Sequence, residues 1–340
     1  MHRAVSGGEV SKRVAWIIAW LLIIPTLVWA QTGKSLIPSY QAISTPDFGY
    51  LPTYVARAKN FFTEAGLDVK VIVMNSRVSV PALIANEVHF GVAGPSITAA
   101  LRGAPLKAIY FIYNTSTFQF TARPEIRTAE DLKGKTIAIS SPGATNDFAT
   151  RLMLTKMGLD PVRDVKFIAI GESKARVIAM DQGQVAAAAN NPDVAAELVR
   201  RGYRILMHSG EVFPVPFSGT AVNEKLIKEN PDMIKRWLRA HLRAMQLIRQ
   251  RPDEAAQIAA KDLKISLDIA KEATAQVLQF MYANDPGGFT EKGMRIFLQQ
   301  TAPRLGVDPE KVAINQIADV SFLREVQREL GIKCRDGFGC

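Results

Sequence analysis

Residues 48–74 have the sequence Phe48-Gly-Tyr-Leu-Pro-Thr-Tyr-Val-Ala-Arg-Ala-Lys-Asn-Phe-Phe-Thr-Glu-Ala-Gly-Leu-Asp-Val-Lys-Val-Ile-Val-Met74. This stretch predicts a loop, a helix, a glycine that ends the helix, and a strand. The apolar residues that share one helical face are Leu51, Val55, Ala58 and Phe62. Gly66 suits the left-handed residue that closes a helix, and the side chains after it alternate as in a strand. A helix followed closely by a strand is the repeating unit of α/β proteins.

The same alternation extends outward from Leu36 to about Val222 and predicts an α/β fold with mostly parallel strands. The expected strands lie near 36–43, 67–74, 88–92, 107–112, 136–140, 165–169, 185–189 and 203–207. The expected helices between them lie near 51–64, 77–85, 96–102, 145–157, 173–182 and 193–200. The final third is predicted to be mostly helical, with helices from about 231 to 251 and near 253–261, 266–283, 290–304 and 321–330.

Two lobes are expected, because a chain of 340 residues exceeds the size that one core comfortably fills. The chain is predicted to cross between lobes before Pro124 and again within the Pro- and Gly-rich stretch from Met207 to Thr220. Residues 31–120 and 217–340 would then form a discontinuous first lobe, and 121–216 the second. Two crossings make a hinge, and ligands of open α/β sheets bind outside the carboxyl ends of the strands. We therefore expect a ligand cleft between the lobes.

The wording of residues 48–74 and the order of motifs from about 36 to 330 resemble the solute-binding proteins of ABC transporters. The resemblance is to the branch that includes nitrate, taurine, sulfonate and thiamine-precursor binders. It implies a two-lobed periplasmic binding protein fold of type II that captures a small molecule and delivers it to a membrane permease. Binders of this type are usually monomers, so the expected partners are a small-molecule ligand and the transmembrane subunits of an ABC permease.

Residues 1–30 have the features of an export signal, which predicts a periplasmic protein. Arg3, Lys12 and Arg13 supply a basic start, and the stretch from Val14 to Ala30 is apolar except for one threonine. Cleavage is expected after Ala30. The alternative is an uncleaved anchor helix, because the apolar stretch approaches the length that spans a bilayer.

The composition excludes several other classes of protein. The formal charge of +10 comes from basic residues that are scattered among acids, without a nucleic-acid-binding motif. The four histidines lie too far apart in sequence for a zinc site, and no metal or cofactor is expected. Cys334 and Cys340 are the two cysteines, and they either close a short disulfide loop or remain free thiols.

The loop Ser141-Pro-Gly-Ala-Thr145 is the clearest candidate for ligand contact. It follows an expected strand and opens an expected helix, so its backbone N–H groups should point toward the cleft and attract anionic oxygens. Gly143 and Ala144 would permit close approach of a ligand, and the two hydroxyls would donate hydrogen bonds. The alternative is an ordinary helix cap. The resemblance favours the first interpretation, because this loop matches a ligand-contacting loop of the family.

Other candidates come from turns that also follow the carboxyl ends of expected strands. The resemblance assigns Ser44, Phe48 and Tyr50 to a cleft-lining loop, although Phe48 and Tyr50 would equally serve as packing. Asn191 opens another helix, whereas Asp193 is interpreted as a helix cap. The complete set of predicted ligand-binding residues is Ser44, Phe48, Tyr50, Ser96, Asn114, Ser141, Gly143, Ala144, Thr145 and Asn191. Because neither Ser141–Thr145 nor Ala93–Ser96 contains a basic residue, an anionic ligand or a neutral heterocycle fits these turns.

One enzymatic alternative arises from the resemblance itself. Thiamine-pyrimidine synthases of the same superfamily resemble these binders but use a cysteine-rich iron motif. This chain has no cysteine before Cys334, and it carries no nucleophile elbow, phosphate-binding loop or dinucleotide fingerprint. We therefore predict a binding protein rather than an enzyme.

Overall fold

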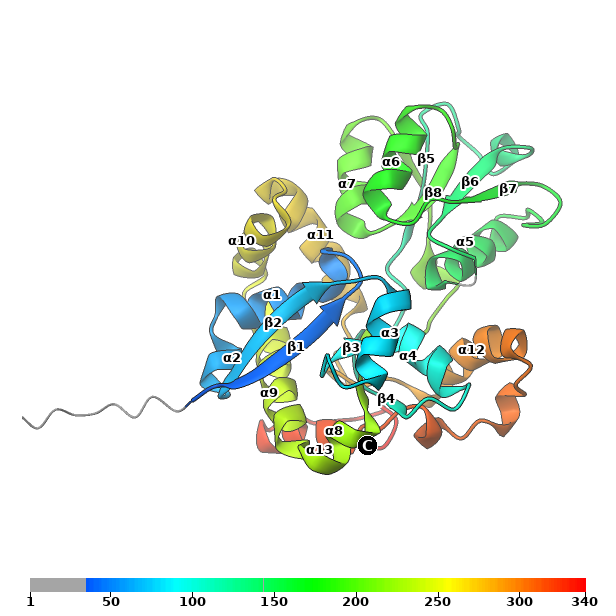
Figure 1. Cartoon of the computed structure of the whole chain (residues 1–340). Coiled ribbons are helices and arrows are strands. Elements are labelled where there is room, and N and C mark those ends of the chain that lie inside the picture. The colour runs from blue at the N-terminus through cyan, green and yellow to red at the C-terminus, as the bar shows by residue number, and fades with distance from the viewer. Residues whose placement is uncertain (1–34, 143) are drawn as a thin grey trace, which may run out of the picture. The chain divides into compact units, whose positions relative to one another are not determined.

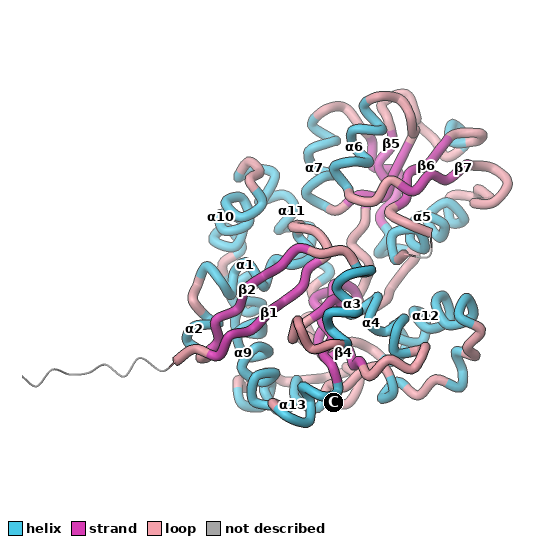
Figure 2. Tube along the Cα trace, in the orientation of Figure 1, coloured by secondary structure: helices cyan, strands magenta, loops and turns pink. Residues whose placement is uncertain are grey.

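The computed structural model describes residues 35–142 and 144–340, and Leu36–Cys340 form one compact unit. The predicted export signal lies outside the described residues. Within them, no helix combines the length and the apolar character needed to cross a membrane. Figure 2 shows the strands gathered in two places with helices around each group, which is the mixed α/β architecture expected from the sequence.

Two small sheets form what we call the first lobe. β1 (Ile37–Ile43) pairs in parallel with β2 (Leu67–Val73). β10 (Phe217–Asn223) lies between β3 (Gly91–Val92) and β4 (Leu106–Tyr113) and is antiparallel to both. The helices around these sheets are α1 (Leu51–Ala58), α2 (Phe61–Glu64), α3 (Ser76–Ile84), α4 (Ala93–Ala100), α8 (Glu224–Glu229) and α9 (Pro231–Gln250).

The C-terminal helices also belong to the first lobe, so this lobe is assembled from both ends of the chain. They are α10 (Pro252–Leu263), α11 (Leu267–Phe280), α12 (Glu291–Thr301) and α13 (Ser321–Glu329), with short 3-10 turns between α12 and α13. Figure 1 shows the blue α1 beside the yellow α9 and α10. Because these segments lie about 200 residues apart in sequence, the lobe is discontinuous.

A five-stranded sheet with the order β7-β6-β8-β5-β9 forms what we call the second lobe. Its strands are β5 (Gln119–Ala122), β6 (Thr136–Ile139), β7 (Lys166–Ala169), β8 (Ala187–Asn190) and β9 (Arg204–His208). Its helices are α5 (Thr145–Lys156), α6 (Ser173–Asp181) and α7 (Pro192–Arg200). The parallel core β7-β6-β8 follows the sequence prediction, whereas β5 is antiparallel to both of its neighbours.

The two connections between the lobes run side by side. The outgoing segment follows β4 and the returning segment precedes β10. The Thr115 hydroxyl donates to the Phe213 carbonyl at 3.1 Å, and the Ser116 amide donates to the same oxygen at 3.2 Å. The Ser209 and Ser116 hydroxyls are 2.8 Å apart. Two adjacent crossings of this kind form the hinge that the sequence predicted. The residue boundaries of the two predicted lobes remain a prediction.

Residues 48–74 fold largely as their sequence predicts. Gly66 has a φ of +80°, the left-handed conformation that ends a helix. The expected single helix is divided, however, because Asn60 adopts a φ of 58° and separates α1 from α2. A non-glycine residue in this region is uncommon, and asparagine is one of the few that tolerate it.

The core of the first lobe is built around Trp237 on α9. Its indole stacks on Phe90 at a ring-centroid distance of 4.8 Å and meets Tyr110 edge-on at 5.4 Å. His241, one turn further along, is fully buried, and burial lowers its pKa to about 3. The Nε2 atom of this neutral imidazole lies 3.1 Å from the Thr53 hydroxyl. His241 is therefore a structural residue of the core.

Candidate functional site

Turns from both lobes meet at the carboxyl ends of strands. The first lobe contributes the loop after β1 and the turn from β3 into α4. The second lobe contributes the loop from β6 into α5 and the turn from β8 into α7. The side-chain amide of Asn191 donates to Oδ2 of Asp47 at 2.8 Å, which joins two of these turns. A Cβ atom placed on Gly94 would lie 3.8 Å from Oγ1 of Thr145, which brings the other two together.

Further contacts hold the same faces against each other. The guanidinium of Arg304 lies 4.1 Å from the ring centroid of Phe148 on α5. Arg200 on α7 is paired with Glu272 on α11 at 3.6 Å. Gln119 on β5 donates to the side chain of Gln276 on α11. The described residues therefore place predicted site turns of the two lobes within direct contact distance.

Asp47 is the central acceptor of this meeting point. It caps the 3-10 turn η1 (Phe48–Tyr50), and its Oδ1 accepts the Gly49 amide at 2.7 Å. Its Oδ2 accepts the Thr45 hydroxyl as well as the Asn191 amide. Burial raises the pKa of Asp47, while these hydrogen bonds and the charge of Arg176 oppose that rise. Asp47 therefore links a local cap to a contact between lobes.

The predicted residues of the first loop have separate roles. Ser44 is exposed, and its amide donates to the Tyr50 hydroxyl at 3.1 Å, so the two residues close the loop. Phe48 is fully buried, and its carbonyl accepts the Tyr113 hydroxyl at 2.8 Å. Burial, followed by the charge of Asp47, raises the pKa of Tyr50 to about 12. Phe48 therefore packs in the core, while the hydroxyl group of Tyr50 closes the loop by its hydrogen bond with Ser44.

The turn into α7 carries a second buried carboxyl group. Asp193 stands in the first turn of α7, two residues after the predicted site residue Asn191. Its side chain is buried, and its Oδ1 has no hydrogen-bond partner among the described residues. Burial, followed by the charge of Asp47, raises the pKa of Asp193 to about 7. Oδ1 of Asn190, at the end of β8, is a second buried acceptor without a partner among the described residues, so this turn favours a ligand that donates hydrogen bonds.

Arg176 on α6 is the buried basic group of this region. Its guanidinium donates to the Gly171 carbonyl, to the Ser173 hydroxyl at 2.8 Å and to the Ala189 carbonyl at 3.2 Å. It therefore fastens the start of α6 to the end of β8. Burial lowers the pKa of Arg176 to about 10, and the charge of Asp47 acts in the opposite direction. The sequence pattern around Arg176 gave no signal of this position.

The loop before α5 keeps the features that made it a candidate. Ser141 is exposed, while Ala144 and Thr145 are half-buried. Ala144 occupies the cap position of α5 and has no polar side chain with which to cap this helix. Gly143 lies outside the described residues. A helix start without a side-chain cap fits the predicted role in ligand contact, and that role remains a prediction.

Two predicted residues are not brought to the meeting point by side-chain contacts. The Ser96 hydroxyl donates to the Val92 carbonyl at 2.7 Å, a bond to the preceding turn of its own helix. Asn114 is exposed at the start of the first crossing, and its amide donates to the Phe280 carbonyl at 3.1 Å. These contacts give Ser96 a role in α4 and Asn114 a role in the hinge.

Surface hollows occur elsewhere on the first lobe. One of 740 Å³ is lined by residues that include Lys107, Glu224 and Lys311. Another of 350 Å³ lies between α1 and α10, beside Arg57 and Asp262. Neither is lined by a predicted site residue. Lys107 is held by the Asn315 and Gln316 carbonyls at 2.7 and 2.8 Å, so its ammonium group is already engaged.

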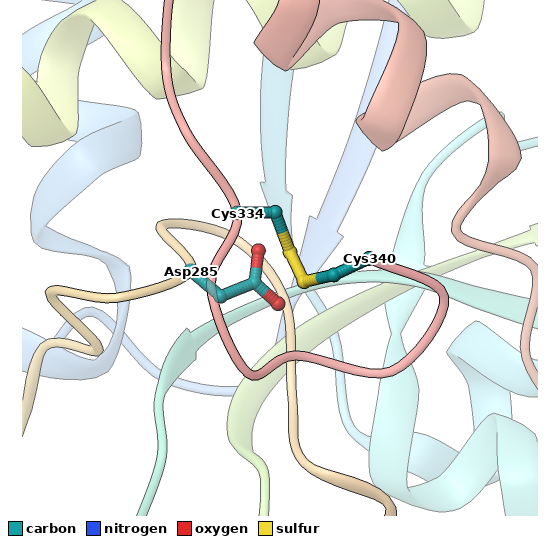
Figure 3. A group of neighbouring side chains, drawn as sticks. All are labelled: Asp285, Cys334 and Cys340. Carbon is teal, nitrogen blue, oxygen red and sulfur yellow. A yellow bond between two sulfur atoms is a disulfide. The ribbon is translucent and has the colours of Figure 1, made fainter.

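One cluster has the residue types of a metal site. Asp285 lies beside Cys334 and Cys340 near the C-terminus (Figure 3). The two cysteines form a disulfide, so the alternative of two free thiols is wrong. The Asp285 carboxylate accepts bonds from both terminal nitrogens of Arg324, and Gln327 donates to its Oδ1 at 2.8 Å. All three residues are thus committed to fastening the C-terminal tail, and this donor set does not fit a metal ion.

A family model described as NMT1/THI5 like matches residues 47–255, more than half of the chain. Among curated proteins, the riboflavin-binding protein RibY of Chloroflexus aurantiacus is 29% identical over 242 residues. That match covers 68% of this chain and 65% of RibY, which is just under two thirds of that relative's length.

Solved structures share the fold. The periplasmic aliphatic sulphonate-binding protein SsuA from Escherichia coli matches with a TM-score of 0.65 and 18% identity, over 84% of this chain and 92% of SsuA. The periplasmic nitrate-binding protein NrtA from Synechocystis PCC 6803 matches with a TM-score of 0.71 and 16% identity, over 87% of this chain and 89% of NrtA. At these identities the likeness shows the periplasmic binding protein fold.

Proposed function

The chain belongs to the NMT1/THI5-like family, and from that premise we propose that it is the extracytoplasmic solute-binding component of an ABC importer. It captures a small molecule between its two lobes and delivers it to the transmembrane subunits of a permease. The observation that carries the proposal is the contact between Asn191 and Asp47, which joins strand-end turns of opposite lobes at 2.8 Å. Strand ends that face each other across a hinge are where binding proteins enclose their ligands.

The comparisons support a binding role. The curated relative is named a binding protein, and the two solved neighbours are named periplasmic binding proteins. The periplasm is accordingly the compartment we propose for this chain, in agreement with the export signal expected at residues 1–30. A synthase with a cysteine-rich iron motif is disfavoured, because the sequence holds no cysteine before Cys334. We propose that the protein acts as a monomer.

The hinge and the site are connected in a way that suits capture of a solute. Hydrogen bonds from Thr115 and Ser116 to Phe213 join the two crossings. The two segments therefore act together as one hinge strip. Rotation about this strip separates Asp47 from Asn191 or brings them together. A solute that contacts both lobes therefore favours the closed arrangement, because only that arrangement provides both sets of contacts.

A thermal-shift screen of the purified protein tests the proposal. We expect one or more compounds from a library of amines, amidines, guanidines, carboxylates, sulfonates and nitrate to raise the melting temperature. At about 100 times Kd the added stability is about 2.7 kcal/mol. Replacing Ser141 and Thr145 together by alanine should reduce the shift. The matched control is Thr155→Ala, an exposed position near the far end of the same helix, which should leave the shift unchanged.

Two results would count against this proposal. If no compound stabilises the protein, solute binding is contradicted. If the Ser141 and Thr145 double variant binds as tightly as the Thr155→Ala control, the loop before α5 does not contact the solute.

A further inference from the structure

Two carboxyl groups and one guanidinium group lie at the meeting point of the lobes, and of the two acids Asp47 is half-buried while Asp193 is buried. Asp47 comes from the first lobe, and Asp193 and Arg176 come from the second. We call the two carboxylates the acid pair. They influence each other, since the charge of Asp47 raises the pKa of Asp193 and both raise the pKa of Tyr113. Tyr113 donates to the carbonyl of Phe48, the residue after Asp47, so Tyr113 lies beside the loop that carries Asp47.

The two acids differ in how well they are satisfied. Asp47 accepts bonds from the Thr45 hydroxyl, the Gly49 amide and the Asn191 amide. Asp193 is only 8% exposed; the backbone N–H groups of Asp193 and Val194 oppose the rise of its pKa, but its Oδ1 accepts no bond from a described residue. A buried acceptor without a donor is costly, since the group has lost its water contacts without replacing them. Oδ1 of Asp193 is therefore available to accept a hydrogen bond from the ligand.

Neighbouring basic groups do not donate a hydrogen bond to Oδ1 of Asp193. The terminal nitrogens of Arg176 donate to Gly171, Ser173 and Ala189, and its buried Nε has no partner among the described residues. Lys174, whose charge acts weakly on Asp193, is exposed to solvent. When both acids are ionised, the acid pair and Arg176 sum to one negative charge. A single cationic group on the solute would bring the buried charge to zero.

We propose that the solute carries a cationic nitrogen group, as an amine, amidine or guanidine does, and that this group donates a hydrogen bond to Asp193. The inference rests on the proposed function and adds the charge class of the ligand. It differs from the anionic ligand or neutral heterocycle that the sequence turns suggested, because the sequence indicated neither Asp47 nor Asp193 as part of the site.

The affinity for the cation should depend on pH. The groups that face Asp193 are Asp47 and Tyr113 of the first lobe and Lys174 of the second. With its pKa raised to about 7, Asp193 holds a proton below that pH, and a bound cation must displace it. The affinity should therefore rise between about pH 6 and pH 8, and Asp193→Asn should abolish that rise.

The experiment uses two libraries matched in size and titrated calorimetrically into the purified protein. One contains amines, amidines and guanidines, and the other contains carboxylates, sulfonates and nitrate. We expect binding from the first library, and a loss of about 10- to 100-fold in affinity for Asp193→Asn, the range of a lost charge-assisted hydrogen bond. The control is Asp68→Asn, which removes one exposed negative charge on β2 and should not weaken binding.

Each alternative outcome identifies which proposal fails. Binding of anions alone, or cation binding that Asp193→Asn leaves unchanged, overturns the inference and leaves the solute-binding function intact. Failure of both libraries contradicts the function as well. Should Asp193→Asn fail to fold, the pH profile of the wild-type protein decides alone, because an affinity for cations that stays flat from pH 6 to pH 8 overturns the role of Asp193.

Discussion

Replacing Arg324 by methionine is expected to destabilise the protein by about 3–5 kcal/mol, the cost of breaking a buried ion pair from one side. Arg324 is 7% exposed and Asp285 is fully buried. Both terminal nitrogens of Arg324 donate to the Asp285 carboxylate, one of them at 2.8 Å. Without the guanidinium, the Gln327 amide is the one side-chain donor to Asp285 that remains among the described residues. Urea unfolding of the wild type and the variant measures the difference.

Two further variants make this result specific. Arg163→Met breaks an ion pair with Asp160 in which the Arg163 side chain is 81% exposed, so its unfolding midpoint should stay near that of the wild type. Adding Asp285→Asn to Arg324→Met should recover part of the loss, because the buried negative charge is then gone. An Arg324→Met variant that unfolds at the same urea concentration as Arg163→Met would refute the structural role of this pair.

Replacing Asp193 by asparagine is expected to stabilise the unliganded protein at pH 8. The pKa of Asp193 is raised from 3.8 to about 7 in the folded state, so between these values the folded protein holds the extra proton. Its stability therefore falls as the pH rises through this window. A pKa rise of about three units lowers the free energy of unfolding at pH 8 by at most about 4 kcal/mol. The substitution also removes a negative charge that is favourable in the first turn of α7, and this loss offsets about 0.3–1 kcal/mol of the expected stabilisation.

Melting temperatures at pH 4 and pH 8 measure this effect. The variant should melt above the wild type at pH 8 and close to it at pH 4, where Asp193 is protonated in the folded protein. Asp68→Asn again serves as the control, since Asp68 is exposed. If Asp193→Asn were destabilised equally at both pH values, the carboxyl group of Asp193 would not be held at an energetic cost.

Local patterns predicted most of the fold because they report local structure. The helix, the glycine and the strand of residues 48–74 each follow from spacing within a few residues, and only the break at Asn60 was missed. The antiparallel strand β10 was harder to predict from the sequence. Its sequence follows a Pro- and Gly-rich stretch, and its partner β4 lies about 100 residues earlier, so no local pattern shows the pairing.

The candidate site was partly predictable for the same reason. Asn191 was predicted from its place between a strand and a helix, and the structure gives it a contact across the lobes. Asp47 and Asp193 resemble ordinary helix-start residues in the sequence, because capping and ligand binding use the same side chains. The influence of each on the other depends on packing between the lobes. Arg176 had no signal, since an arginine within a helix is usually exposed.

Amide hydrogen exchange of the purified protein, with and without a saturating solute from the screen, tests whether the solute binds between the lobes. We expect residues 44–50 of the first lobe and 191–194 of the second to become protected together, because the solute binds where these turns meet. Protection confined to one lobe, or to the hollow lined by Lys107, would contradict this expectation.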